Sequence, residues 1–170
     1  MAELIAFYSR AGENYVNGAI RNLSVGNTEL VALCLQKATG AELFKIEPCC
    51  SYSQDYSECI NQAKCDQMRN ARPELVHYPK DMEKYEILYL GFPNYWGTMP
   101  MCVFTFLEQC HFQGRKIVLF CTHEGDGFGR SAEDVKQFYP DVCIEYGPDI
   151  RGIRIPHVKD IIHEWMEGTE

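Results

Sequence analysis

The sequence predicts an α/β fold, a doubly wound five-stranded parallel sheet with helices on both faces. The first observation behind this prediction is that short apolar runs alternate five times with helical patterns along the 170 residues, an order typical of parallel sheets. The second is that an aromatic loop and a glycine-rich loop follow two of the apolar runs, at the strand ends where open α/β sheets hold ligands. Because 170 residues with 46% hydrophobic content suffice for one sizeable core, we expect a single domain, 1–170.

Each expected strand is a short apolar run. The first, 4–8, is apolar nearly throughout, as is typical of a strand covered on both faces. The second, 41–47, alternates apolar and polar side chains and is followed by Pro48, which indicates an edge strand. The other three strands are expected at 85–91, 115–121 and 142–146.

The helices are expected at 29–39, 55–69, 99–111, and from about 131 and about 157. Asn27 or Thr28 can cap the first helix and Gly40 can end it, and Pro100 suits the first turn of the third. The last helix has one apolar face, formed by Val158, Ile161, Ile162, Trp165 and Met166. The second helix also has one distinct side, formed by Tyr56, Cys59, Ile60, Ala63 and Gln67.

An insertion at about 13–25 separates the first strand from the first helix, where a connection of two to six residues is usual. It contains Asn17-Gly18, a pair that favours a tight hairpin turn. We expect a small hairpin from Tyr15 to Leu23 that stands over the strand ends. A surface loop without a role is the alternative.

Charge and composition exclude several classes of protein. The formal net charge of −8 argues against a nucleic-acid partner, because no basic stripe would neutralise phosphates. No apolar run reaches the roughly 18 residues that a membrane span needs, and the first residues lead straight into a strand without a signal segment. We therefore expect a cytoplasmic protein without a membrane span.

The nine cysteines include no Cys-x-x-Cys pair, so we expect reduced side chains and neither a disulfide framework nor a metal site. Four of them lie on apolar faces and are interpreted as small packing residues: Cys34, Cys102, Cys110 and Cys121.

Other ligand motifs of α/β folds are missing from the sequence. The first strand is not followed by Gly-x-Gly-x-x-Gly, which a nicotinamide-binding domain needs, and no Gly-x4-Gly-Lys-Ser/Thr motif is present. Cys121 and Arg130 are too far apart for the Cys-x5-Arg cradle of a small phosphatase. The ligand loops must therefore be interpreted by their own residues.

Four loop motifs resemble those of the flavodoxin family, specifically the short flavodoxin-like proteins, and the resemblance covers essentially the whole chain. They are Tyr8-Ser-Arg-Ala-Gly12, Gly26-Asn-Thr28, Gly91-Phe-Pro-Asn-Tyr-Trp-Gly-Thr-Met-Pro100 and Cys121-Thr-His-Glu-Gly-Asp-Gly-Phe-Gly-Arg130. The resemblance implies strand order 2-1-3-4-5 and FMN at the carboxyl ends of the strands. The family's compact phosphate loop, Ser/Thr-x-Thr-Gly-x-Thr, is here split by the insertion. Its two pieces can hold one phosphate only if the insertion loops out.

The resemblance implies that the two pieces of this split loop bind the FMN phosphate through Ser9, Arg10, Ala11, Asn27 and Thr28. The start of a helix offers free N–H groups and the positive end of its dipole to such an anion. Turn and cap chemistry is the alternative role for Ser9 and Thr28, and an ion pair with a surface carboxylate is the alternative for Arg10.

The flavin ring is expected to lie between the other two loops, on Pro93, Asn94, Tyr95, Trp96, Gly97, Thr98, Thr122, His123, Glu124, Gly125, Gly127, Phe128 and Gly129. Tyr95 and Trp96 are the candidates for stacking, with Phe128 as a third. At least one of the two consecutive aromatic residues should face the site, because both cannot easily face one core.

Several polar residues of these loops have two interpretations. Thr98 and Thr122 can donate to the ring or the ribityl chain, and Thr98 equally suits a helix cap. His123 can bond the flavin or a quinone, or serve structurally. Glu124 and Asp126 can lower the flavin potential, since a charge at about 10 Å contributes roughly 1.7 kcal/mol at an effective dielectric of about 20. For Glu124 a solvated loop charge is the preferred interpretation.

Two functions follow from the resemblance. The first is an FMN-binding electron carrier that docks to a redox partner protein through its acidic surface. The second is an FMN-dependent NAD(P)H oxidoreductase that reduces quinones or similar small-molecule acceptors. A flavin-free binding module is a third interpretation, for the case that the split loop does not hold FMN. A homodimer is left open by the resemblance.

Overall fold

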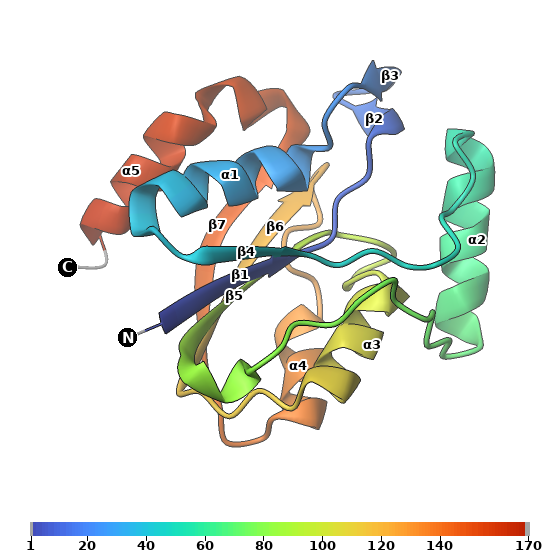
Figure 1. The fold of residues 1–170 in the computed structure, drawn as a ribbon. Coiled ribbons are helices and arrows are strands. Elements are labelled where there is room, and N and C mark those ends of the chain that lie inside the picture. The colour runs from blue at the N-terminus through green and yellow to red at the C-terminus, as the bar shows by residue number, and fades with distance from the viewer. Residues whose placement is uncertain (1, 169–170) are drawn as a thin grey trace.

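The computed structural model describes residues 2–168 and confirms the α/β architecture (Figure 1). Five parallel strands form one sheet in the order β4-β1-β5-β6-β7, which is the predicted order 2-1-3-4-5 once the insertion is set aside. Their bounds are β1 Ala2–Phe7, β4 Glu42–Lys45, β5 Tyr85–Pro93, β6 Lys116–His123 and β7 Cys143–Arg151.

Four helices cover the two faces of the sheet, with α1 and α5 on one face and α3 and α4 on the other (Figure 1). The helices are α1 Asn27–Thr39, α2 Tyr56–Met68, α3 Met101–Cys110, α4 Ser131–Phe138 and α5 Val158–Gly168, with short 3₁₀ turns η1 Met82–Lys84 and η2 Gly152–His157. The period-2 alternation of β1 divides the core, because Ile5 and Phe7 pack on the α1 and α5 side while Leu4 and Ala6 pack on the other.

Helix α2 does not belong to either layer. It stands beyond the carboxyl ends of the strands, apart from the sheet faces (Figure 1). Its buried residues are only Cys59, Ala63 and Asp66, a stripe too narrow to cover a sheet face. The chain after α2 covers the sheet instead, through the buried side chains of Leu75 and Met82.

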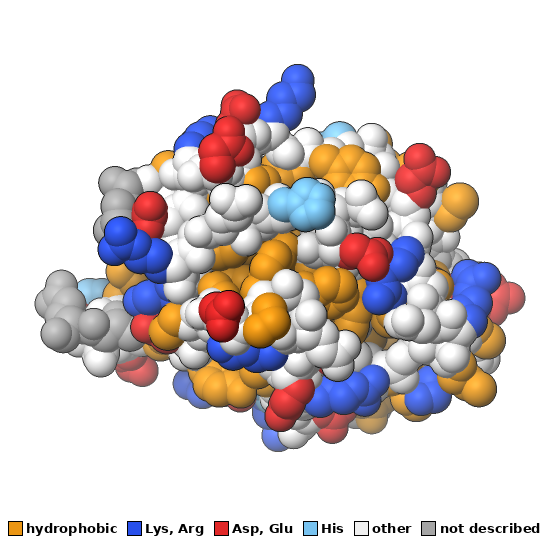
Figure 2. All heavy atoms as spheres, turned by 90° about the horizontal axis from the view of Figure 1, so that it is seen from below, with side chains coloured by type: hydrophobic (Ala, Val, Ile, Leu, Met, Phe, Trp, Pro, Cys, Tyr) orange, Lys and Arg blue, Asp and Glu red, His pale blue; other side chains and the backbone are white. Residues whose placement is uncertain are grey.

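That face is shown in Figure 2, seen from below the view of Figure 1. Hydrophobic side chains gather at its centre, and acidic and basic side chains surround them (Figure 2). Val76 and Tyr78, from the chain after α2, are among the large hydrophobic residues that remain exposed. None of the helices within residues 2–168 has the length and apolar character that crossing a membrane would require.

The insertion forms the predicted hairpin. Its strands are β2 Gly12–Val16 and β3 Ala19–Leu23, paired antiparallel. Asn17 and Gly18 both have positive φ, 48° and 85°, as a two-residue hairpin turn requires. The first strand begins at Gly12, earlier than the expected Tyr15, because its pairing with Leu23 extends to the base of the insertion.

Some predicted boundaries were wrong. Asn27 and Thr28 lie inside α1, whose N-cap is Gly26, while Gly40 ends the helix with φ 77° as expected. Pro100 is the N-cap of α3 and precedes its first turn. Strand β7 continues past its predicted end to Arg151, because Pro148 lies at a register shift of this edge strand, between the residues that pair with Leu119 and Cys121.

Candidate functional site

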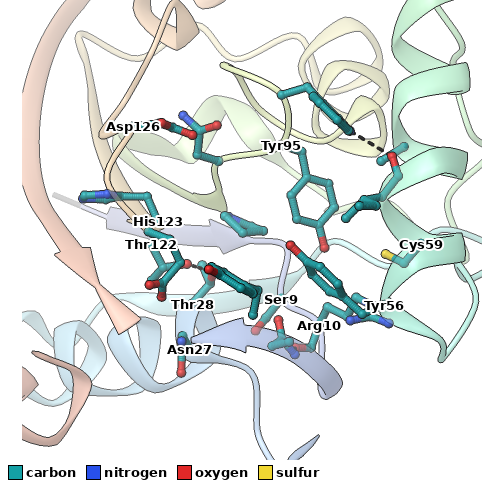
Figure 3. Close-up of a pocket in the computed structure, with 18 residues that line it drawn as sticks. Ser9, Arg10, Asn27, Thr28, Tyr56, Cys59, Tyr95, Thr122, His123 and Asp126 are labelled. Carbon is teal, nitrogen blue, oxygen red and sulfur yellow. Dashed lines mark hydrogen bonds between the residues drawn. The ribbon is translucent and has the colours of Figure 1, made fainter. Parts of the chain in front are cut away.

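A cavity of about 280 Å³ lies at the carboxyl ends of β1, β5 and β6. Its walls are formed by the hairpin, the two loop pieces that flank it, the loops after β5 and β6, and α2 (Figure 3). Its lining residues are Ser9, Arg10, Asn14, Tyr15, Asn27, Thr28, Tyr56, Cys59, Ile60, Ala63, Pro93, Asn94, Tyr95, Trp96, Thr122, His123, Glu124 and Asp126. This is the edge at which the sequence analysis expected a ligand.

Eleven of the predicted site residues line this cavity, namely Ser9, Arg10, Asn27, Thr28, Pro93, Asn94, Tyr95, Trp96, Thr122, His123 and Glu124. The others are not among its lining residues: Ala11, Gly97, Thr98, Gly125, Gly127, Phe128 and Gly129. Phe128 packs against the core and lies 5.0 Å from the Tyr146 ring, and the Thr98 hydroxyl donates to Asp134. Thr98 is therefore neither on the cavity nor the cap of α3.

The two pieces of the split loop meet, because the hairpin loops out between them. Ser9 Oγ accepts a hydrogen bond of 3.1 Å from the backbone N–H of Glu29, in the first turn of α1. A methyl group added at Gly26 would lie 2.2 Å from Ser9 Oγ and 2.6 Å from the carbonyl oxygen of Arg10. Only glycine fits where the two segments touch.

The start of α1 opens into this junction. Gly26 offers no side-chain cap, and among residues 2–168 no group accepts from the N–H groups of Asn27 and Thr28. Thr28 Oγ1 and Thr122 Oγ1 are buried and hydrogen-bonded to each other at 2.8 Å. Free N–H groups at a helix N-terminus form an anion site.

Arg10 lines the cavity, but among residues 2–168 it pairs with no carboxylate. Its guanidinium donates to three backbone carbonyl oxygens, those of Glu13, Ser53 and Gln54. The charge therefore serves to hold the base of the hairpin against the segment that leads into α2. The alternative of an ion pair with a surface carboxylate was therefore wrong, and a contact with a phosphate stays a prediction.

Tyr95 contacts the buried Tyr8 at the floor of the cavity. Their rings meet edge to face with centroids 5.9 Å apart, and their side chains are hydrogen-bonded. Burial raises the pKa of both hydroxyls well above the usual value. Both stay neutral at physiological pH, so Tyr95 presents a fixed, uncharged ring to the cavity.

Trp96 lies at the rim and packs against α2. Its Nε1–H donates to the carbonyl oxygen of Ile60 at 2.9 Å, the interaction marked by the dashed line in Figure 3. Lys64 Nζ lies 5.1 Å from the ring centroid, and Gln67 Nε2 donates to the Trp96 carbonyl. The sequence predicted that at least one of Tyr95 and Trp96 faces the site, and both of them line the cavity.

The loops after β5 and β6 are tied to each other. Asn94 Nδ2 donates to the carbonyl oxygen of Gly127 at 2.9 Å. A Cβ at Gly129 would lie 2.1 Å from the carbonyl oxygen of Gly97. Gly129 therefore permits contact between the two loops, and contact of these glycines with a flavin ring stays a prediction.

His123 and Glu124 are both held by backbone groups. His123 Nδ1 accepts from the N–H of Gly125 at 2.9 Å, which places the proton of a neutral ring on Nε2, 3.9 Å from Asp149. Glu124 Oε2 accepts from the N–H of Asn17 at the hairpin tip, 3.0 Å away. The loop charge of Glu124 therefore also fixes the tip of the hairpin.

Sequence reasoning missed a whole wall of the cavity, formed by Asn14, Tyr15, Tyr56, Cys59, Ile60 and Ala63. The signal was present, because four of these residues recur at helical spacing in α2. The sequence analysis identified this side of the helix but assigned it no partner, and in the structure it faces the cavity. The rings of Tyr15 and Tyr56 stack at 6.1 Å and join the hairpin to α2.

All nine cysteines are free thiols, and Cys102, Cys110 and Cys121 are buried packing residues as expected, whereas Cys34 is only partly buried. Burial raises the pKa of the Cys110 thiol to about 12. Cys59 also lines the cavity, and burial raises the pKa of its thiol. Both thiols are therefore protonated at neutral pH.

Solved structures with the same fold cover nearly the whole chain. A protein from Bacteroides eggerthii that is provisionally described as a flavoprotein matches with a TM-score of 0.71 and 24% identity, over 95% of this chain and 98% of that one. A similarly described protein from Bacteroides uniformis matches with a TM-score of 0.72 and 20% identity, over 95% of this chain and 97% of that one. A flavoprotein from Lactobacillus acidophilus, solved in complex with FMN, matches with a TM-score of 0.65 and 16% identity over 97% and 98%.

The comparison with curated proteins finds no match. The family model described as Flavodoxin matches residues 20–169. This match includes α1 and the loops after β5 and β6, three of the elements that build the cavity. The chain belongs to the flavodoxin family.

Proposed function

We propose that this chain binds FMN in the cavity at the carboxyl edge of the sheet and transfers electrons through it. The observation that carries the proposal is the closure of the split phosphate loop, where Ser9 and Gly26 meet at the open start of α1. The fold shared with the FMN complex of the Lactobacillus flavoprotein supports the same assignment.

The residues of the cavity suit the parts of FMN. The unpaired N–H groups of Asn27 and Thr28 suit the phosphate. Tyr95 and Trp96 suit a flat ring, and the hydroxyls of Thr28 and Thr122 suit the polar chain between phosphate and ring. No full positive charge is required at the phosphate, since the helix terminus itself carries partial positive charge.

FMN, when bound, supplies one- and two-electron redox chemistry. The protein's share of the mechanism is to bind, orient and exclude water. Tyr95 is kept in place by Tyr8, so a ring placed against it has one orientation. Glu124 and Asp126 put negative charge on the opposite wall, which opposes further negative charge in the cavity and lowers the reduction potential of a bound group.

The test compares FMN with riboflavin, which lacks only the phosphate. Titration of flavin-free protein, followed by flavin fluorescence, should give one FMN bound per chain and at least about tenfold weaker binding of riboflavin, because charge-assisted hydrogen bonds contribute about 1.5–3 kcal/mol. Equal affinity for both would remove the assigned phosphate site. No binding of either flavin would leave the flavin-free binding module.

The second function, an NAD(P)H-dependent oxidoreductase acting on quinones or similar acceptors, is supported by the extra wall that α2 and the hairpin add to the cavity. Anaerobic addition of NADH or NADPH to the FMN-loaded protein separates the two. Bleaching of the flavin absorbance within seconds would favour the reductase. An unchanged spectrum would favour a carrier reduced by a redox partner protein in the cytoplasm.

A further inference from the structure

We propose that the α2 side of the cavity is a second subsite, which takes a neutral, flat aromatic carbonyl compound beside the FMN. The inference rests on the proposed function, because it divides the same cavity between two ligands. It concerns binding at the wall formed by Tyr15, Tyr56, Ile60 and Ala63.

The position of α2 creates this wall. A helix packed on a sheet face would leave the strand ends open, whereas α2 stands opposite them (Figure 1). Figure 3 shows Tyr56 and Cys59 on one side of the cavity and Thr122, His123 and Asp126 on the other. The proposed function places the FMN phosphate near Ser9 and the flavin ring against Tyr95. The α2 side of the cavity is therefore left for a different molecule.

The wall is aromatic and rigid. The stacked rings of Tyr15 and Tyr56, with planes 23° apart, are fixed from two directions. Glu13 Oε2 accepts from the N–H of Tyr56 at 2.9 Å, and Asp55 caps the helix by accepting from the N–H of Glu58 at 2.9 Å. A preformed aromatic surface favours a flat partner, since stacking against it orders few side chains.

The Tyr56 hydroxyl is a free donor. Among residues 2–168 no group is hydrogen-bonded to it, whereas the Tyr95 hydroxyl is already engaged by Tyr8. Burial raises the pKa of Tyr56, so the proton stays on the hydroxyl at neutral pH. A carbonyl oxygen on the bound molecule would satisfy this donor.

The charge of the cavity selects a neutral molecule. Arg10 is the one cation among the lining residues of the described chain, and three backbone carbonyls already occupy its guanidinium. Glu124 and Asp126 are acidic, and the start of α1 is reserved for one phosphate. A second anionic group would meet acidic side chains without a free cation.

The probes are menadione, which is neutral, and 1,4-naphthoquinone-2-sulfonate, which carries a negative charge on the same ring system. Both are titrated into oxidised FMN-loaded protein without reductant, so that the readout is equilibrium binding by calorimetry. We expect menadione to bind at least about tenfold more tightly than the sulfonate. Tyr56→Phe should weaken menadione binding about fivefold, the size of one neutral hydrogen bond, and Tyr56→Ala should weaken it further.

Tyr78→Phe is the matched control, because it removes an exposed hydroxyl outside the cavity and should change nothing. Near-ultraviolet circular dichroism and the FMN affinity of each variant show that the fold and the flavin site persist. Equal binding of the two probes, insensitivity to both Tyr56 substitutions, or displacement of FMN by menadione would each overturn the subsite.

The same menadione titration on flavin-free protein, followed by tryptophan fluorescence, keeps the two proposals distinguishable. FMN binding without Tyr56-dependent menadione binding would overturn the subsite alone. Tyr56-dependent menadione binding in a protein that never binds FMN would support the wall as a binding site and overturn the proposed function.

Discussion

Single residues determine whether the two halves of the phosphate loop meet. Gly26 is the clearest case, because its missing side chain is what lets Ser9 and Arg10 approach the start of α1. Its φ of −64° is open to any residue, so the requirement is one of space and not of backbone conformation. Its role is thus decided by tertiary contact.

Gly26→Ala should lower FMN affinity by more than about tenfold, since the added methyl group must push Ser9 away from the helix start. Flavin fluorescence titration measures the change. Gly168→Ala is the matched control, because a Cβ there meets nothing within 4 Å. Unchanged FMN affinity in Gly26→Ala would mean that the phosphate lies elsewhere.

Tyr139 is a single residue that makes the stability of the fold depend on pH. Burial raises its pKa from 10.0 to about 12, and its hydroxyl donates to the Leu107 carbonyl. Because the folded pKa is the higher one, its contribution to stability is complete below pH 10 and is lost as the pH rises toward 12.

Tyr139→Phe should therefore cost about 1 kcal/mol at pH 7 and make stability fall less steeply between pH 10 and 12. Urea unfolding at several pH values measures both effects. Tyr146→Phe, at an exposed ring, should leave the slope as in the unsubstituted protein. An equally steep fall in Tyr139→Phe would contradict the assignment.

Among the elements, the hairpin acts as a strap across the cavity. Its base is fixed to the segment before α2 by Arg10 and Glu13, and its tip is fixed to the loop after β6 by Glu124. It thus joins the two walls that face each other across the cavity. The insertion is therefore a hairpin with contacts on both sides of the cavity, and its role in ligand binding stays a prediction.

Glu124→Ala should release FMN about fivefold faster, because the hairpin tip loses the acceptor of the Asn17 N–H. Glu124→Gln keeps an oxygen at that position and should release FMN at nearly the unsubstituted rate. Stopped-flow mixing of loaded protein with an FMN trap measures the rate. Equal acceleration in both variants would mean that the acceptor oxygen at the hairpin tip does not slow FMN release.

At the scale of the whole molecule, a net charge of −8 repels the FMN phosphate before contact. Salt screens this repulsion, since the Debye length falls from about 30 Å at 0.01 M to about 8 Å at 0.15 M. The FMN association rate should rise on the order of threefold over this range. Riboflavin lacks the phosphate and should show no such rise. A rate that falls with salt would indicate a locally basic entrance.

The sequence by itself determined the sheet, its order once the family resemblance was recognised, the hairpin and the edge that holds the cavity. These features follow from local signals, namely the apolar runs, the Asn17-Gly18 turn and the loops at strand ends. Each such signal depends only on residues that are neighbours in the sequence. The predicted site residues in the loops after β5 and β6 divided, however, into cavity residues such as Tyr95 and residues that pack against the core, such as Phe128.

Only the tertiary structure decided what the helical face of α2 contacts and what Arg10 and Glu124 bind. A spacing of three and four residues shows that a helix has a face, but the same pattern suits a core and a cavity wall. Hydrogen-bond partners far apart in the sequence, such as Asn17 and Glu124, are set by where the folded elements meet. The cavity's second wall therefore arises from the placement of α2, which no local signal encodes.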